Sequence, residues 1–168
     1  MRRLRYCVAT SLDGFITSPN GACDWIEMDP DADFGSFFQQ FDALIMGRKT
    51  YEVTKHGPGP VMPGMTTYVY SSSLPSDFDS QVVIEKDAVT HVEKLKCEPG
   101  KDIWLFGGGS LFRSLLDAQL VDTIELSLAP ILISRGTPLV VEGVRSPKLK
   151  LVETNPSSTG AVALKYEN

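Results

Sequence analysis

The sequence predicts an α/β fold in which a twisted, mostly parallel sheet is flanked by helices. Two short apolar runs, at 43–46 and 103–106, each end in glycine and continue into helix-compatible sequence. Further strand and helix patterns alternate between and around them, and the chain closes with two strand patterns and no intervening helix. With 168 residues, 42% hydrophobic and 22% charged, we expect one domain over residues 1–168.

The strands are expected where short apolar or alternating runs are bounded by turn residues. The first follows the basic N-terminus, and the last two surround a Pro/Ser/Gly turn, which predicts a closing antiparallel hairpin. The expected strands cover residues 4–9, 43–46, 67–70, 81–84, 103–106, 123–128, 149–153 and 161–166.

Four helices are expected from capping residues and apolar spacing. Asp29-Pro30 is suited to open the first, because Phe34, Phe37, Phe38 and Phe41 follow at positions that share one helical face. A second begins near Lys49. Asp87 can cap a third, which carries Ala88, Val89, Val92 and Leu95, and the fourth presents Leu111, Phe112, Leu115 and Leu116.

Composition excludes several classes of function. A net charge of −5 argues against nucleic acid as a general partner. The three cysteines are widely spaced and do not form a disulfide framework, which favours a reducing compartment. The apolar run after the N-terminus is too short for a signal sequence or a membrane span, so we expect a cytoplasmic protein. His56 and His91 have no partners at ligand spacing, so no metal site is expected.

The two glycine junctions are the strongest functional signal. In each, a buried strand would enter a helix through glycine and leave backbone N–H groups free to bind a phosphate. Neither Gly107-Gly108-Gly109 nor Gly47-Arg48-Lys49-Thr50 matches a standard nucleotide-binding spacing. A plain glycine turn and an exposed basic helix start are the alternatives, but two junctions together would suit the two halves of a dinucleotide.

The carboxylates allow more than one interpretation. Asp13 precedes Gly14 in a turn, where a turn-forming role is expected. Asp29, Asp31 and Asp33 crowd the start of the phenylalanine helix and would stabilise its dipole there. One of them could instead be a buried proton donor, provided that desolvation raises its pKa.

Several blocks of sequence together resemble the dihydrofolate reductase superfamily. They resemble in particular the reductase domain of bacterial riboflavin biosynthesis (the RibD C-terminal domain) and its small stand-alone relatives. The resemblance covers nearly the whole chain. It rests on the order and spacing of Ser11-Leu12-Asp13-Gly14, Trp25-Ile26, the segment 45–52, Ser71-Ser72, Gly107-Gly108-Gly109, Leu120-Val121-Asp122 and Ala129-Pro130.

The resemblance implies an NADPH-dependent reductase. By position, Ala9 and Ile16 would flank the nicotinamide, and Arg48 and Ser72 would lie near the 2′-phosphate. Phe112 stands where dihydrofolate reductases often have a tyrosine beside the nicotinamide, and Ser110 replaces a basic residue. The implied cofactor-binding residues are Ala9, Ile16, Gly47, Arg48, Lys49, Thr50, Ser71, Ser72, Gly107, Gly108, Gly109, Ser110 and Phe112.

The substrate side departs from both well-known relatives. Met65 stands where dihydrofolate reductases place an arginine for the folate carboxylate, and the stretch 29–40 has no Lys or Arg to hold a phosphoribosyl group. We therefore expect a pocket for a neutral or cationic heterocycle. The candidate catalytic residues are Asp31, Asp33 and Trp25, and the expected pocket is lined by Asp13, Trp25, Phe34, Phe38 and Met62.

Three functions stay open from the sequence. The first is an NADPH-dependent reductase of a pterin- or pyrimidine-like heterocycle. The second is the riboflavin-biosynthesis 5-amino-6-(5-phosphoribosylamino)uracil reductase. The third is a nucleotide-binding protein that senses cofactor without chemistry. The relatives also imply a homodimer, for which the strand at 123–128 and the terminal hairpin would supply the interface.

Overall fold

The computed structural model describes residues 1–55 and 62–168. Within those residues no helix is both long and apolar enough to cross a membrane. His56, one of the two histidines considered above, lies outside the described residues. The elements in chain order are β1 (Leu4–Ser11), β2 (Phe15–Thr17), α1 (Phe34–Phe38), β3 (Phe41–Gly47), α2 (Arg48–Lys55), β4 (Thr66–Tyr70), β5 (Val83–Glu85), α3 (Ala88–Cys97), β6 (Asp102–Gly107), α4 (Gly109–Asp117), β7 (Thr123–Ala129), β8 (Thr137–Pro138), β9 (Lys150–Pro156) and β10 (Val162–Glu167).

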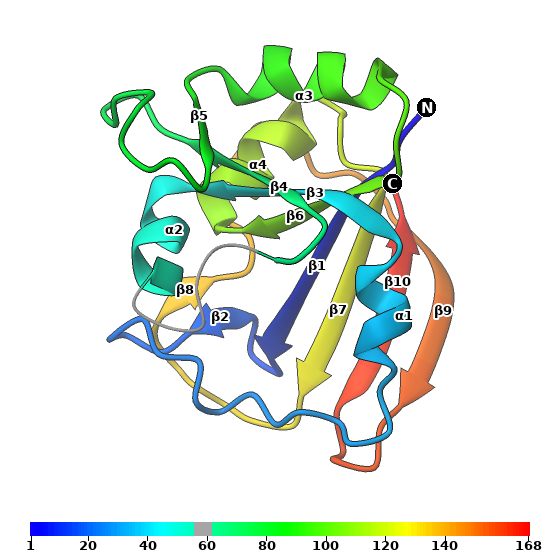
Figure 1. Cartoon of the computed structure of the whole chain (residues 1–168). Helices are drawn as coiled ribbons and strands as arrows, with labels where there is room; N and C mark the ends of the chain where they lie inside the picture. Colours follow the sequence, from blue (N-terminus) through cyan, green and yellow to red (C-terminus); the bar gives the residue numbers. More distant parts are fainter. Residues whose placement is uncertain (56–61) are drawn as a thin grey trace.

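A single large sheet organises the molecule (Figure 1). Its strands follow the order β5-β4-β3-β6-β1-β7-β10-β9. The pairs from β5 to β7 are parallel, whereas β10 pairs antiparallel with both β7 and β9. The central strands are nearly continuous apolar runs because both of their faces are covered. The predicted α/β class, with its mostly parallel sheet and closing antiparallel hairpin, is confirmed.

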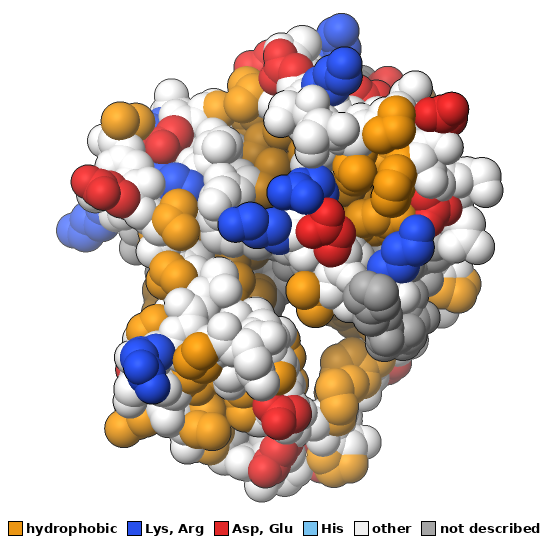
Figure 2. All heavy atoms as spheres, turned by 90° about the vertical axis from the view of Figure 1, so that its left-hand side faces the viewer, with side chains coloured by type: hydrophobic (Ala, Val, Ile, Leu, Met, Phe, Trp, Pro, Cys, Tyr) orange, Lys and Arg blue, Asp and Glu red, His pale blue; other side chains and the backbone are white. Residues whose placement is uncertain are grey.

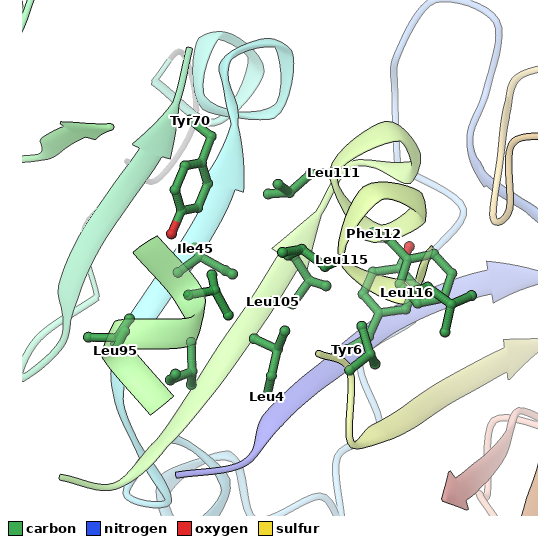
Figure 3. Close-up of a cluster of buried hydrophobic side chains, with 14 of the residues drawn as sticks. Leu4, Tyr6, Ile45, Tyr70, Leu95, Leu105, Leu111, Phe112, Leu115 and Leu116 are labelled. Atoms are coloured by element: carbon green, nitrogen blue, oxygen red, sulfur yellow. The ribbon is translucent and has the colours of Figure 1, made fainter. Parts of the chain in front are cut away.

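The larger core cluster lies between the sheet and helices α3 and α4 (Figure 3). Leu4, Ile45 and Leu105 come from neighbouring strands and are completely buried. They share this cluster with Leu95 of α3 and Leu115 of α4. The apolar spacing predicted for these two helices therefore faces the sheet, and the Asp87 side chain caps α3 by accepting a hydrogen bond from the Thr90 amide, at 3.1 Å.

The opposite face of the sheet carries α1 and α2 and a second, aromatic cluster. Phe37 of α1 lies 5.3 Å from Trp104 and 5.1 Å from Phe41, measured between ring centroids. Tyr51 of α2 is completely buried there. Among the described residues, α1 and α2 are shorter than α3 and α4, and the space left beside α1 and α2 becomes the candidate site.

The first helix is shorter than predicted. It begins at Phe34, not near Asp29-Pro30, because the Asp29 carboxylate accepts a bond from the Asp31 amide and holds a turn there. Asp33 is the N-cap, and its carboxylate accepts from the Ser36 amide at 2.9 Å. Phe41 is not helical but is the first residue of β3, where it pairs with Asp102.

A second, two-stranded sheet was not predicted. Phe15 pairs with Pro138 and Thr17 with Thr137, so β2 and β8 lie antiparallel beside the main sheet. Asp13 accepts hydrogen bonds from the amides of Ile133 and Ser134, at 3.1 and 2.7 Å, and ties the β1–β2 turn to the segment that leads to β8. These two segments border the candidate site.

Candidate active site

A cleft of about 1640 Å³ runs along the sheet face that carries α1 and α2. Figure 2 shows a hollow on the side of the molecule that carries α2 and β2, with basic and acidic side chains next to each other at its upper rim. The part of its lining that contains the two strand-to-glycine junctions we call the glycine end. The part that contains the side chains of Phe34, Phe37, Phe38, Met62, Trp104 and Phe106 we call the aromatic end.

The glycine end brings the predicted junctions side by side. Strands β3 and β6 are neighbours, and Met46 pairs with Gly107 just before each strand continues into its helix. Gly107 has a φ of 140°, which favours glycine. A Cβ on Gly108 would lie 3.2 Å from Thr50 Oγ1, so the starts of α2 and α4 approach too closely for a larger residue to fit without a shift. The starts of α2 and α4 therefore line one space, and backbone N–H groups at a helix N-terminus favour an anion.

Polar side chains surround this pair of N-termini. Arg48 donates to Glu52 at 2.9 Å, and the neighbouring Lys49 is exposed. Ser71 at the end of β4 is buried, and its hydroxyl already accepts from the amides of Ser73 and Leu74. The hydroxyls that follow it in the chain line the cleft. All the expected cofactor-binding residues except Phe112 line this cleft, namely Ala9, Ile16, Gly47, Arg48, Lys49, Thr50, Ser71, Ser72, Gly107, Gly108, Gly109 and Ser110.

The aromatic end is an apolar wall built around the buried ring of Trp104. Phe38 stacks on Trp104 with 5.7 Å between ring centroids and 27° between planes. The indole of Trp104 donates to the Cys7 carbonyl at 3.1 Å, which fixes the ring on the sheet. Phe34, Phe38 and Met62 line the cleft as expected, whereas Trp104 was not predicted as a site residue. The sequence could have indicated Trp104, because Trp104 and Phe106 are two residues apart on one strand and therefore point to the same face of the sheet.

The carboxylates at the rim are not buried acids. Asp33 lines the cleft but is exposed to solvent. Hydrogen bonds from the Ser36 hydroxyl and amide lower the pKa of Asp33, which is opposite to the raised pKa that a proton donor requires. Asp31 is exposed and does not line the cleft. The expectation of a desolvated acid at either position is therefore wrong, and Asp33 is ionised near neutral pH.

Residues 2–163 match the family model of the RibD C-terminal domain. The chain belongs to the RibD C-terminal domain family. It is 35% identical to the uncharacterized protein YyaP of Bacillus subtilis (strain 168), over 98% of this chain and 94% of YyaP. Among solved structures it is similar to a protein from Shewanella sp. PV-4 named for riboflavin biosynthesis, with a TM-score of 0.82, 23% identity, and coverage of 99% of this chain and 98% of that one.

A second structural relative is the dihydrofolate reductase of Enterococcus faecalis complexed with NADP(H). Its TM-score is 0.73 at 18% identity, and the match covers 98% of this chain and 95% of that one. At this level of identity the likeness shows the shared fold. The dihydrofolate reductase-like architecture expected from the sequence is thereby confirmed for this member of the RibD C-terminal domain family.

Four expected site residues lie outside the cleft wall in this family member: Asp13, Trp25, Asp31 and Phe112. Asp13 is occupied by the bonds to Ile133 and Ser134 described above. Phe112 is only 1% exposed and stacks on Tyr6 at 3.9 Å, so it packs in the core because its position on α4 faces the sheet. Trp25 borders a separate pocket of about 190 Å³, and within the described residues its buried indole nitrogen has no partner.

Charged residues on the cleft floor were missed from the sequence. Arg5 of β1 is buried and makes two bonds to Glu125 of β7, at 2.8 and 2.7 Å. Burial by itself would raise the pKa of Glu125, but the bonds and charge of Arg5 outweigh it and leave that pKa below its ordinary value. Lys165 of β10 lies 3.5 Å from the same carboxylate. Only the parallel register of β1 and β7 brings Arg5 and Glu125 together, so no local pattern indicated them.

Proposed function

We propose that this RibD C-terminal family member is an NADPH-dependent reductase of a neutral or cationic, pterin- or pyrimidine-like heterocycle. The observation that carries the proposal is the asymmetry of one continuous cleft. Its glycine end combines two helix N-termini with Arg48 and Lys49, whereas its aromatic end combines stacked rings with an excess of carboxylates. A dinucleotide and a flat ring can therefore lie next to each other, as hydride transfer requires.

The glycine end fits the phosphates of a nicotinamide dinucleotide. Gly108 and Gly109 have no side chain, and a Cβ on either would approach Thr50 Oγ1 or the Pro138 carbonyl to 3.2 or 3.1 Å. This leaves a cradle lined by backbone at the start of α4. Arg48 and Lys49 add positive charge at the start of α2. The structural likeness to a dihydrofolate reductase complexed with NADP(H) supports the same cofactor, which supplies a hydride when bound.

The aromatic end fits a ring without negative charge. Its charged lining residues are two cations, Arg5 and Lys165, and the carboxylates of Glu27, Asp29, Asp33, Glu125 and Glu153. Arg5 is already paired with Glu125, which leaves the rim acidic. A phosphate or carboxylate would be repelled there, whereas an aromatic ring would stack on Phe38, which itself lies on the buried Trp104.

The protein's own residues would bind and orient the cofactor and the substrate ring. Phe38, fixed against the buried Trp104, would hold the plane of the ring, and the starts of α2 and α4 would hold the dinucleotide beside it. Because Asp33 is ionised, it would accept a hydrogen bond from a ring N–H or pair with a cationic ring nitrogen. The proton that balances the hydride would come from solvent at the open side of the cleft, since no expected acid is buried there.

A substrate screen tests the proposal. NADPH oxidation is followed with uncharged dihydropterins and aminopyrimidines, and with their phosphorylated counterparts, for wild type and Asp33→Asn. We expect turnover of an uncharged ring and a roughly tenfold or greater loss of kcat/KM in Asp33→Asn, about 1.4 kcal/mol of transition-state stabilisation. Tight NADPH binding without turnover of any heterocycle would overturn the reductase and favour a cofactor-sensing protein.

The second candidate is the 5-amino-6-(5-phosphoribosylamino)uracil reductase of riboflavin biosynthesis. Family membership favours it, and Lys165 supplies a cation inside the cleft that the sequence pattern did not indicate. It predicts that the phosphorylated substrate is preferred and that Lys165→Met removes this preference. A preference for the dephosphorylated pyrimidine would exclude it and support the first proposal.

A homodimer through the C-terminal hairpin is also part of the proposal. Strand β9 is the edge of the sheet and is exposed along its whole length, with Leu151 and Val152 exposed by 49% and 41%. An exposed apolar edge strand favours pairing with another chain. Light scattering on wild type and Val152→Lys would test it, since a monomeric wild type would overturn the dimer.

A further inference from the structure

Charged side chains from three neighbouring strands form a row on the cleft floor. Arg5, Glu125 and Lys165 come from β1, β7 and β10, and all three line the cleft. Lys165 is the register partner of Glu125, and its ammonium nitrogen lies 3.5 Å from Glu125 Oε1. The side chains of Lys165 and Glu125 are 29% and 17% exposed, so each reaches the cleft from a largely buried position. The register of β7 and β10 therefore places an acceptor and a donor side by side in the cleft wall.

The two carboxylate oxygens of Glu125 are not equivalent. Oε1 accepts from Arg5 Nε and Thr123 Oγ1, each at 2.8 Å, and it also faces Lys165. Of the nitrogen and oxygen donors in the described residues, only Arg5 Nη2 bonds to Oε2, at 2.7 Å. The Cys7 thiol beside this carboxylate is a weak donor that a ligand N–H can displace. Because each carboxylate oxygen can accept two hydrogen bonds, Glu125 has room for one ligand donor but not for two.

The Lys165 ammonium keeps donors that no other group uses. It carries three N–H bonds, and among the described residues its one ion-pair partner is Glu125, beyond the usual N–H···O hydrogen-bond distance. A carbonyl oxygen in the cleft can therefore accept from Lys165. A second N–H donor or a protonated ring nitrogen would instead be opposed by its positive charge. Together the two side chains complement a ligand edge that has one donor next to one acceptor.

We propose that Glu125 and Lys165 determine substrate specificity by binding the lactam edge, –NH–C(=O)–, of a neutral heterocycle. The inference rests on the proposed function, and it narrows the class of ring. The ring N–H donates to Glu125 Oε2, and the adjacent carbonyl accepts from Lys165. A protonated amidine edge presents two donors, so one of them would lie against the ammonium. Asp33 stands at the exposed rim and would meet a different edge of the same ring.

Lys165 can be changed without loss of the fold. It makes one long ion pair, whereas β10 is held on both sides by its ladders to β7 and β9. Lys165→Met keeps most of the length of the side chain and removes its donors, and Lys165→Arg restores a donor. Lys150→Met is the matched control, because Lys150 lies on β9, is exposed and does not line the cleft.

Equilibrium binding of three ring compounds tests the inference without turnover. Lumazine, which is 2,4-dioxopteridine, presents the lactam edge, and 1,3-dimethyllumazine lacks its N–H donors. The third compound, 2,4-diaminopteridine, is measured at mildly acidic pH, where it is protonated. Dissociation constants are determined by calorimetry for wild type, Lys165→Met, Lys165→Arg and Lys150→Met, and circular dichroism confirms that each protein is folded. NADPH binding and oxidation are followed in the same preparations.

We expect Lys165→Met to weaken lumazine binding about tenfold, as for loss of one hydrogen bond from a charged donor. The same variant should bind protonated 2,4-diaminopteridine about three- to tenfold more tightly, because a like charge is removed. A merely structural role of Lys165 would not move the two ligands in opposite directions. Lys165→Arg should recover most of the lumazine affinity, the affinity for 1,3-dimethyllumazine should change little, and Lys150→Met should match wild type.

Three results would overturn the inference. They are no binding of lumazine by wild type, equal affinity of wild type for lumazine and its dimethyl derivative, and unchanged lumazine affinity in Lys165→Met. If Lys165→Met weakens only phosphorylated pyrimidines, Lys165 is a phosphate ligand and the inference is likewise wrong. The proposed function fails separately, if wild type neither binds nor oxidises NADPH, and the pattern of ring binding still decides the role of Lys165 in that case.

Discussion

Gly108 and Thr50 meet where α4 and α2 begin, and the distance from Thr50 Oγ1 to the position of a Cβ on Gly108 is 3.2 Å. The two residues lie far apart in the sequence and come together because β3 and β6 are paired. The absence of a side chain at Gly108 thus lets the starts of α2 and α4 pack closely at the candidate phosphate site.

Replacing Gly108 should therefore disturb the fold and the cofactor site together. In Gly108→Ala we expect the free energy of unfolding to fall by about 1–2 kcal/mol, because the methyl group crowds the hydroxyl of Thr50. NADPH affinity should fall at least tenfold, about 1.4 kcal/mol. Urea unfolding and cofactor titration measure the two effects.

Thr50 provides the matched control for Gly108. If crowding is the cause, the destabilisation by Gly108→Ala should be smaller in a Thr50→Ala background, where the hydroxyl is absent. A double-mutant cycle on unfolding free energies measures this coupling. An equal loss of unfolding free energy on Gly108→Ala in both backgrounds would show that the added methyl group does not clash with the Thr50 hydroxyl.

The stacked pair of Phe38 and Trp104 leads to a prediction about substrate binding. Phe38→Ala should raise KM for the heterocycle by about three- to tenfold, the loss expected from one aromatic stacking contact of roughly 0.5–1.5 kcal/mol. NADPH binding should not change, because Phe38 belongs to the aromatic end of the cleft. Phe78→Ala is the control, since Phe78 is exposed by 47% and lies outside the cleft. A similar KM change in both variants would contradict the assignment.

The glycine junctions were predictable because their chemistry is local. Gly47 and Gly107 each follow an apolar run in the sequence, and parallel strands bring such junctions to one edge of a sheet. The first helix was less predictable. The spacing of the phenylalanines favoured a helix through Phe41, but pairing of Phe41 with Asp102 in the sheet was the stronger constraint.

Other site features could not be predicted because they depend on contacts between distant segments. Arg5 and Glu125 meet through strand register, which no local pattern in the sequence reveals. The position of Phe112 was misassigned because the resemblance gave its place in the chain but not the face of α4 on which it lies. Asp33 has the expected location at a helix start, but exposure and its capping bonds give it a lowered pKa.

Asp13 should make stability depend on pH. Bonds from the Ser11 hydroxyl and from the amides of Ser134 and Ile133 lower its pKa in the folded state. Ionised Asp13 therefore stabilises the fold above the unfolded-state pKa of about 4, and this contribution is lost as pH falls through the lower folded-state pKa. Urea midpoints measured from neutral to acidic pH should fall less steeply in Asp13→Asn than in wild type. Asp77→Asn, which removes an exposed carboxylate elsewhere, is the control. Identical pH profiles for all three proteins would contradict a stabilising role for the hydrogen bonds to Asp13.

The buried pair of Arg5 and Glu125 should be costly to break but replaceable as a unit. The side chains are 7% and 17% exposed, so Glu125→Leu leaves a guanidinium with little access to water and should lower the free energy of unfolding by about 3 kcal/mol. In the double variant Arg5→Met/Glu125→Leu the buried guanidinium is removed together with its main partner, the remaining charges of Asp102 and Lys165 reach solvent, and most of that loss should be recovered. Chemical unfolding of the two single variants and the double variant provides the cycle. If the losses instead add, the residual bonds of Arg5 to Gln40 and Asp102 must already satisfy it, and Glu125 would contribute mainly through its charge in the cleft.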